Sequence, residues 1–214
     1  MRSYQQRCGL AKALDVIGDR WTLLIVRELL IRGACRYTDL RSGLPGIATN
    51  LLADRLREME AAGIVVSKAE PPPVATTLFR LTDRGRDLQE SLLKLGQWGS
   101  PFLAKRVKAE TLQPHWLVLP LKLLLVDRSR SDPKLCIQLK VDHELIVIEV
   151  DNGVIEVRLG TSAHPDVVVS GKPDPILHLL GGRMNFAAAA EAGVKVQGPL
   201  QQLLRILPQR PASS

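Results

Sequence analysis

Residues 36–80 read RYTDLRSGLPGIATNLLADRLREMEAAGIVVSKAEPPPVATTLFR, and this stretch decides the fold of the first half of the chain. A short helix is predicted at residues 38–42. Gly43 and the pair Pro45-Gly46 then predict a tight turn, because glycine accepts a positive φ and proline stops a helix. An amphipathic helix is predicted to follow from Ala48 or Thr49 and to end at Gly63.

The residues after Gly63 indicate a hairpin. Residues 64–68 and 76–81 are rich in β-branched side chains, and the run Glu70-Pro71-Pro72-Pro73 supplies a stiff connection between them. A helix, a turn, a second helix and a two-stranded ribbon in this order describe a winged helix-turn-helix. The second helix of such a unit fits the major groove of DNA.

The flanking segments predict three further helices. Apolar residues recur at helical spacing over residues 10–17 and again over 21–31, where Asp19 is the expected cap and Trp21 an expected core residue. Thr82 is expected to cap a helix at 83–98. That helix carries an apolar stripe, which needs a partner surface: Leu88, Leu92, Leu95 and Trp98.

Candidate DNA contacts lie on the second helix of the motif, on the hairpin and at the start of the first helix. Asn50 lies in the first turn of that helix, and an asparagine amide can pair with adenine, whereas the nearby arginines suit phosphates. Asp54 opposes dense phosphate contact. The alternative is that these are ordinary solvated residues on a plain hairpin and helix. The predicted contacts are Arg36, Thr38, Thr49, Asn50, Arg55, Arg57, Lys68, Thr76, Thr77 and Arg80.

Charge and composition narrow the class of protein. The 214 residues carry a net charge of +7, and residues 1–110 hold 18 Lys and Arg against 12 Asp and Glu, so the basic excess belongs to the half with the motif. A basic domain attracts nucleic acid, and equally an anionic membrane surface. There is no apolar run of the roughly 20 residues that a membrane span needs, so we expect a soluble, cytoplasmic protein. The three cysteines are too dispersed for a zinc cluster.

Three ordered runs carry a family resemblance: CGLAKALDVIGDRWTLLIVRELL from residue 8, then the motif itself, then FRLTDRGRDL from residue 79. Over roughly residues 8 to 100 the chain resembles the HxlR-type branch of winged-helix transcription regulators, which are MarR-like. The resemblance implies a homodimer, built largely from the first helix and the helix after the wing, on double-stranded operator DNA. Members often carry Ser-Pro-Lys where this chain has Ala48-Thr49-Asn50, so operator choice can differ.

The resemblance also makes Cys8 a candidate redox sensor. Some members use this N-terminal cysteine to sense oxidants, and Arg7 and Lys12 could lower the pKa of an exposed thiol. The alternative, which we favour from sequence, is a buried small side chain at the start of a helix.

The second half has an α+β pattern. Strands are predicted at 134–141, 145–150, 154–159, 166–170 and 194–197, and helices at 174–180, 184–192 and 199–207, with Asn152-Gly153 as a hairpin signal. The run HPDVVVSGKPDPILHLLGGRMNFAAAAEAGVKVQGPLQQLLRIL resembles the sterol carrier protein type two fold over roughly residues 112 to 208. That fold holds apolar molecules. It implies a pocket for an apolar small molecule or fatty acid, lined by Leu177, Leu180, Phe186, Leu203 and Leu204; the alternative is a filled core.

No catalytic chemistry is predicted. His143, His164 and His178 are scattered, without the spacing of a metal or catalytic site, and the sequence indicates no cofactor, no metal and no enzyme.

The predicted fold class of the whole chain is α+β, with a winged-helix DNA-binding and dimerisation domain at 1–110 and a sterol-carrier-like domain at 111–214. The leading hypothesis is a dimeric transcriptional regulator. The alternative is a lipid-binding or carrier protein that dimerises through its first half.

Overall fold

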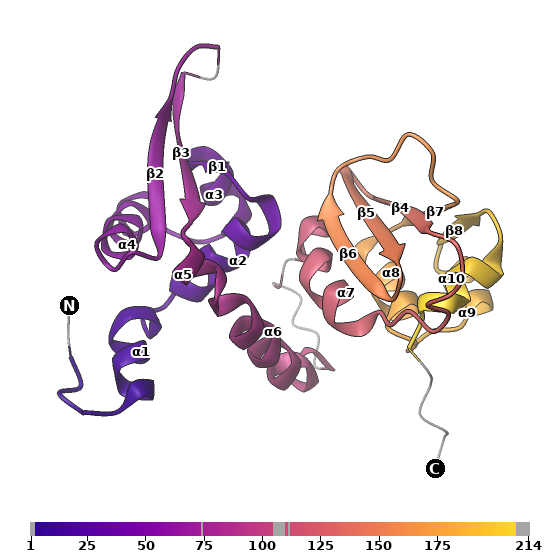
Figure 1. Ribbon diagram of the computed structural model, residues 1–214, viewed down its shortest axis with the longest axis horizontal. Helices are drawn as coiled ribbons and strands as arrows, with labels where there is room; N and C mark the ends of the chain where they lie inside the picture. Colours follow the sequence, from indigo (N-terminus) through magenta and orange to yellow (C-terminus); the bar gives the residue numbers. More distant parts are fainter. Residues whose placement is uncertain (1–2, 74, 105–109, 111, 209–214) are drawn as a thin grey trace. The chain divides into compact units, whose positions relative to one another are not determined.

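The structure is a computed structural model that describes residues 3–73, 75–104, 110 and 112–208 (Figure 1). The chain divides into two compact units, Met1–Phe102 and Leu103–Ser214. The sequence predicted a boundary between residues 110 and 111. Residue 111 and the nearby positions 105–109 lie outside the described residues. The two units are described separately below.

The first unit is a winged helix-turn-helix, as predicted. Strands β2 and β3 form the long hairpin that projects from the helices in Figure 1, and β1 adds a third antiparallel strand in the order β1-β3-β2. The two-residue strand β1 is not predicted by the sequence. The elements are α1 (Gly9–Ile17), α2 (Thr22–Arg32), β1 (Cys35–Arg36), α3 (Tyr37–Gly43), α4 (Thr49–Ala61), β2 (Val65–Glu70), β3 (Thr76–Leu81), α5 (Asp83–Arg86), α6 (Leu88–Gly99) and the 3₁₀ turn η1 (Ser100–Ala104).

Helix α4 is held against the unit by one apolar face. Its core residues are Leu52, Leu56 and Met59, which are buried as the helical spacing predicted, and they pack with Ile25 and Leu40 from the preceding helices. Burying an aliphatic side chain of this size contributes about 1.5–3 kcal/mol, so the three contacts fix which face of α4 is left to solvent.

The ends of the helices follow the sequence in two places and differ in one. Gly63 has φ +67° just after α4, and the Thr82 hydroxyl accepts a hydrogen bond from the Gly85 amide at 3.1 Å, both as predicted. The predicted cap at Asp19 is wrong. Trp21, with φ +83°, precedes the first turn of α2 instead, and the Asp19 carboxylate is drawn to the Arg55 guanidinium on α4.

The second unit is a five-stranded sheet with helices packed against it. The strand order is β6-β5-β4-β7-β8, in which β4 and β7 are parallel and the other neighbours are antiparallel. Helices α7, α8 and α10 contact its strands. The elements are η2 (Pro114–Leu117), α7 (Val118–Leu124), β4 (Leu135–Val141), β5 (Glu144–Asp151), β6 (Val154–Leu159), β7 (Val167–Gly171), α8 (Pro173–Leu180), α9 (Phe186–Glu191), β8 (Lys195–Gln197) and α10 (Leu200–Ile206).

Residues 114–124 form a buried helical entry to this unit. Pro114 is the first residue of η2 and Pro120 lies in the first turn of α7, two places where a helix needs no amide hydrogen from proline. Leu117 and Leu121 have almost no exposed surface. The prolines therefore start helices here.

A buried ion pair ties α10 to the loop between α7 and β4. Arg205 donates from Nε and Nη2 to the two carboxylate oxygens of Asp127 at 2.7 and 3.0 Å, and the amides of Ser129 and Gly153 donate to the same carboxylate. The Arg205 hydrogen bonds, helped by those two amides, lower the pKa of Asp127 to about 2. The pair closes α10 onto the loop that precedes β4.

We expect this pair to give the second unit a distinct acid sensitivity. The pKa of Asp127 is about 2 in the folded chain and near 3.8 in the unfolded chain, so its contribution is present above pH 4 and is lost as the pH falls towards 2. The loss amounts to about 2 kcal/mol. Urea unfolding at pH 5 and pH 2 should show a larger loss for the wild type than for Asp127→Asn; equal losses would contradict the assignment.

Candidate nucleic-acid interface

The first turn of α4 presents polar groups to solvent. Thr49 and Asn50 are exposed, and the Asn50 side-chain oxygen accepts a hydrogen bond from the Leu51 amide at 3.0 Å, which leaves the amide NH₂ directed away from that bond. The Tyr37 hydroxyl donates to the Thr49 carbonyl at 2.5 Å and so links the start of α3 to the start of α4. Ala48, at the cap position, has no polar side chain, so the cap residue itself makes no side-chain hydrogen bond to the first amides of α4.

The two arginines predicted on α4 have different surroundings. Arg57 is exposed and pairs with Asp54 one turn earlier at 2.7 Å. Arg55 is largely covered, with 18% of its side chain exposed, and it pairs with the carboxylates of both Asp19 and Glu58. The phosphate role expected of Arg55 therefore has no support from its geometry. Its guanidinium links α4 to the loop before α2.

The strand register divides the predicted wing residues between two faces. Arg36 and Lys68 both pair with Leu78, and Arg80 lies two residues further along the same strand, so these three cations share one face of the sheet. Thr76 lies on that face as well. We call these three cations the basic row. Thr77 is on the opposite face of the sheet, and this face packs on the core near the base of the hairpin. Only Thr76 can therefore act with the basic row.

The basic row carries one acidic residue. The Glu70 Oε1 atom lies 3.5 Å from Lys68 Nζ and 3.3 Å from Arg80 Nη2. Arg36 is exposed at the start of α3, where its backbone amide donates to the Asp39 carboxylate at 2.9 Å, and Thr38, two residues later, is exposed as well. The wing face and the first turn of α4 together form the candidate interface.

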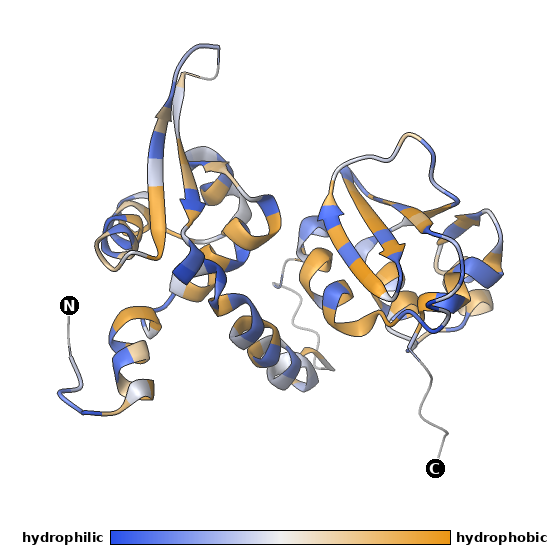
Figure 2. Ribbon diagram, viewed as in Figure 1, coloured by the Kyte–Doolittle hydropathy of each residue, from blue (hydrophilic) through white to orange (hydrophobic). Residues whose placement is uncertain are grey.

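Apolar side chains of the same unit are exposed on α1, α6 and η1, and Figure 2 shows apolar and hydrophilic residues alternating along α1 and α6. The predicted stripe on α6 divides: Leu88 and Leu92 pack against the core, whereas Leu95 and Trp98 are 50% and 72% exposed. The rings of Trp98 and Phe102 meet edge to face at 5.4 Å. The exposed apolar residues of this surface are Leu10, Leu14, Leu95, Trp98 and Phe102.

The cysteines differ in exposure. Cys8 is exposed immediately before α1, so the buried position that we favoured from sequence is wrong, and the sensor role stays a prediction. Cys35 is buried in the core, and burial raises the pKa of its thiol to about 12. In the part of the chain that the structure describes, no group of three or more potential metal ligands occurs.

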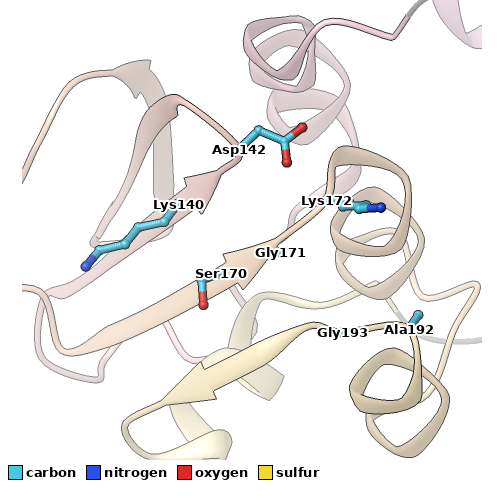
Figure 3. A pocket seen from close by; sticks show the side chains of 7 residues that line it. All are labelled: Lys140, Asp142, Ser170, Gly171, Lys172, Ala192 and Gly193. Carbon is cyan, nitrogen blue, oxygen red and sulfur yellow. The ribbon is translucent and has the colours of Figure 1, made fainter.

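None of the five residues predicted to line an apolar pocket lines either of the two hollows described below. Leu180 and Leu203 are fully buried among their neighbours, and Leu204 is half exposed on the surface of α10. One hollow of about 400 Å³ in this unit is lined by polar and small residues, and Figure 3 shows Lys140 and Lys172 extending away from each other. A second, of about 670 Å³, is lined largely by polar residues that include Glu149, Asp151 and Glu156.

Among the described residues, no helix has the length and apolar character that a membrane crossing needs.

Comparison with known proteins identifies the first unit. Residues 16–107 match the family model of HxlR-like helix-turn-helix proteins. The uncharacterized HTH-type transcriptional regulator YvaP of Bacillus subtilis is 32% identical over 92 residues, which are 43% of this chain and 84% of YvaP. The uncharacterized HTH-type transcriptional regulator sll1512 of Synechocystis is 33% identical over 96 residues, 45% of this chain and 70% of the relative.

Among solved structures, the reduced form of the transcriptional regulator YodB from B. subtilis is 28% identical, with a TM-score of 0.41, and covers 46% of this chain and 96% of its own. The assignment rests on the family model and on the two curated relatives, each of which this chain covers over more than two thirds of its length. The chain belongs to the HxlR-like helix-turn-helix family of transcriptional regulators, and residues 16–107 carry that membership.

Proposed function

We propose that this protein regulates transcription as a cytoplasmic homodimer that binds operator DNA with α4 and the wing of each protomer. Residues 1–110 are the DNA-binding and dimerisation domain, and residues 111–214 are an effector domain. The observation that carries the proposal is the first turn of α4, where Thr49 and Asn50 are exposed on a helix whose other face is fixed in the core. Such a helix can enter a major groove without disturbing its own packing.

The contacts divide by chemistry. Asn50 offers an amide that matches the two hydrogen-bonding positions of adenine, so we assign it to base reading. Arg36, Lys68 and Arg80, with Thr76 beside them, offer donors suited to phosphates, so we assign the basic row to positioning the protein on the duplex. Thr38, Thr49 and Arg57 complete the proposed set on the helices.

The test is a binding titration of the full chain on a DNA fragment from its own promoter region and on a random fragment of equal length. Neutralising phosphates releases counterions, so we expect the affinity for the promoter fragment to fall by about 10³-fold or more between 50 and 200 mM salt. At every salt concentration the promoter fragment should bind more tightly. Binding no tighter than that of the random fragment would contradict the proposal.

Two substitutions distinguish the proposed base contact of Asn50 from the proposed phosphate contact of Lys68. We expect Asn50→Ala to weaken promoter binding by about 5- to 100-fold and to leave random DNA almost unchanged, because a base contact contributes about 1–3 kcal/mol. Lys68→Ala should weaken both fragments alike and reduce the salt slope by about 1. Fluorescence anisotropy on both fragments checks this. If Asn50→Ala weakens the two fragments equally, Asn50 does not read a base.

The dimer that we propose uses the exposed apolar surface of α1, α6 and η1. The C-terminal turn of α1 is anchored because Val16 and Ile17 pack on the core, while Leu10 and Leu14 remain exposed. A second copy would cover these leucines together with Trp98 and Phe102. Burial of such a surface favours association, since apolar area removed from water contributes about 25 cal/mol per Å².

For the second unit we propose a sterol-carrier-like effector domain. The support is a five-stranded sheet contacted by α7, α8 and α10, in the element order that the sequence resemblance implies. An apolar ligand would have to displace buried side chains, because Leu180 of α8 and Leu203 of α10 are now fully buried. Native mass spectrometry and thermal shift with fatty acids test this. A protein that carries no lipid and shows no shift has a filled core, whereas lipid binding without operator binding would favour the carrier hypothesis.

A further inference from the structure

We propose that Glu70 is an intramolecular competitor for DNA phosphate, which holds down the affinity of the wing for any duplex. The inference rests on the proposed DNA-binding function and names a residue that limits it. Glu70 is the last residue of β2, two positions after Lys68, so the alternation of a strand places both side chains on the basic face. Arg80 reaches the same carboxylate from β3.

The contacts show one anion shared by two cations. The Glu70 Oε1 atom accepts from Arg80 Nη2 at 3.3 Å and lies 3.5 Å from Lys68 Nζ. The Glu70 side chain is 18% exposed, whereas the side chains of Lys68 and Arg80 are 67% and 49% exposed. The acid therefore lies beneath the two bases, and the bases remain accessible to an incoming polyanion.

A phosphate that binds Lys68 or Arg80 must share or replace Glu70. Exposed ion pairs are weak, so a polyanion can displace this one, but the displacement and the remaining negative charge reduce the gain. Because phosphate contacts carry no sequence information, the reduction applies to cognate and random DNA alike. Glu70 thus sets the general affinity, and the choice of sequence is left to α4.

The direct test is Glu70→Gln in the full chain, which keeps the shape of the side chain and removes its charge. At about 100 mM salt we expect both promoter and random fragments to bind about 3- to 10-fold more tightly, with a salt slope steeper by about 1. The ratio between the two fragments should not change. Glu156→Gln is the matched control, since it removes one exposed carboxylate from the other unit; a gain of the same size there would overturn the local role of Glu70.

A mutant cycle tests the mechanism. In a Lys68→Ala, Arg80→Ala background the two cations that pair with Glu70 are removed, so the added Glu70→Gln change should give a much smaller gain, which comes from the lost negative charge alone. A gain of undiminished size in that background, or a wild type that binds DNA and does not respond to Glu70→Gln, would overturn the inference. Either result would leave the proposed function standing. Circular dichroism melts of each variant check that the protein remains folded.

Discussion

Gly85→Ala is expected to lower the free energy of unfolding of the winged-helix unit by about 2–4 kcal/mol. A Cβ atom on this buried glycine of α5 would lie 2.2 Å from the carbonyl oxygen of Ile64 and 3.0 Å from Leu81 Cδ2. That carbonyl also accepts a hydrogen bond from the Thr82 amide at 2.9 Å. The clash is with backbone, so it can be relieved only by moving α5 away from the base of the wing.

Urea unfolding followed by circular dichroism measures this effect. Gly9→Ala is the control, because a Cβ atom on Gly9 meets nothing within 4 Å, and its stability should change by less than about 0.5 kcal/mol. A Gly85→Ala protein as stable as the control would show that α5 and β2 are not packed as closely as described.

The second large effect is expected from Trp98→Glu, which should convert the proposed dimer to a monomer and weaken operator binding by about 10²-fold or more. Trp98 is 72% exposed and stacks edge to face with Phe102 at the end of α6, and a charge cannot be buried there without a partner. The loss in DNA binding arises because two linked recognition helices bind far more tightly than one.

Light scattering coupled to size-exclusion chromatography gives the mass directly. The wild type should have twice the chain mass of 23.6 kDa, and Trp98→Glu should have the mass of one chain. Val154→Glu introduces the same charge at an exposed apolar residue of the other unit and should leave the dimer intact. A wild-type monomer, or a Trp98→Glu dimer, would rule out this surface as the interface.

Local signals predicted much of the fold. Helical spacing placed Leu52, Leu56 and Met59 in the core, and the Asn152-Gly153 pair predicted a hairpin at which both residues do have positive φ. These features depend on neighbours close in sequence. That is why spacing and turn chemistry were sufficient to predict them.

Features set by distant partners could not be predicted in the same way. The role of Arg55 depends on Asp19, 36 residues away, and the side chain that best explains the wing, Glu70, was read only as part of a stiff connection. Strand alternation does predict that Thr76 and Thr77 face opposite sides. The side that carries the basic row is set by the pairing of β1 with β3, which places Arg36 opposite Leu78.

The predicted apolar pocket shows a different limit. A run of leucines on α8 and α10 is equally typical of a ligand pocket and of a packed core, because both need the same apolar side chains. Leu180 and Leu203 are fully buried here, so a ligand could enter between them and the sheet only if these side chains moved.

The most direct test of the central claim is a hydroxyl-radical footprint of the full-length wild type on its promoter DNA. A symmetric dimer that inserts two α4 helices should protect two half-sites related by two-fold symmetry, with centres about 10 base pairs or a multiple of that apart. Asn50→Ala should lose this pattern at concentrations where the wild type retains it. Protection of a single unpaired site, or uniform protection without sequence preference, would contradict the account.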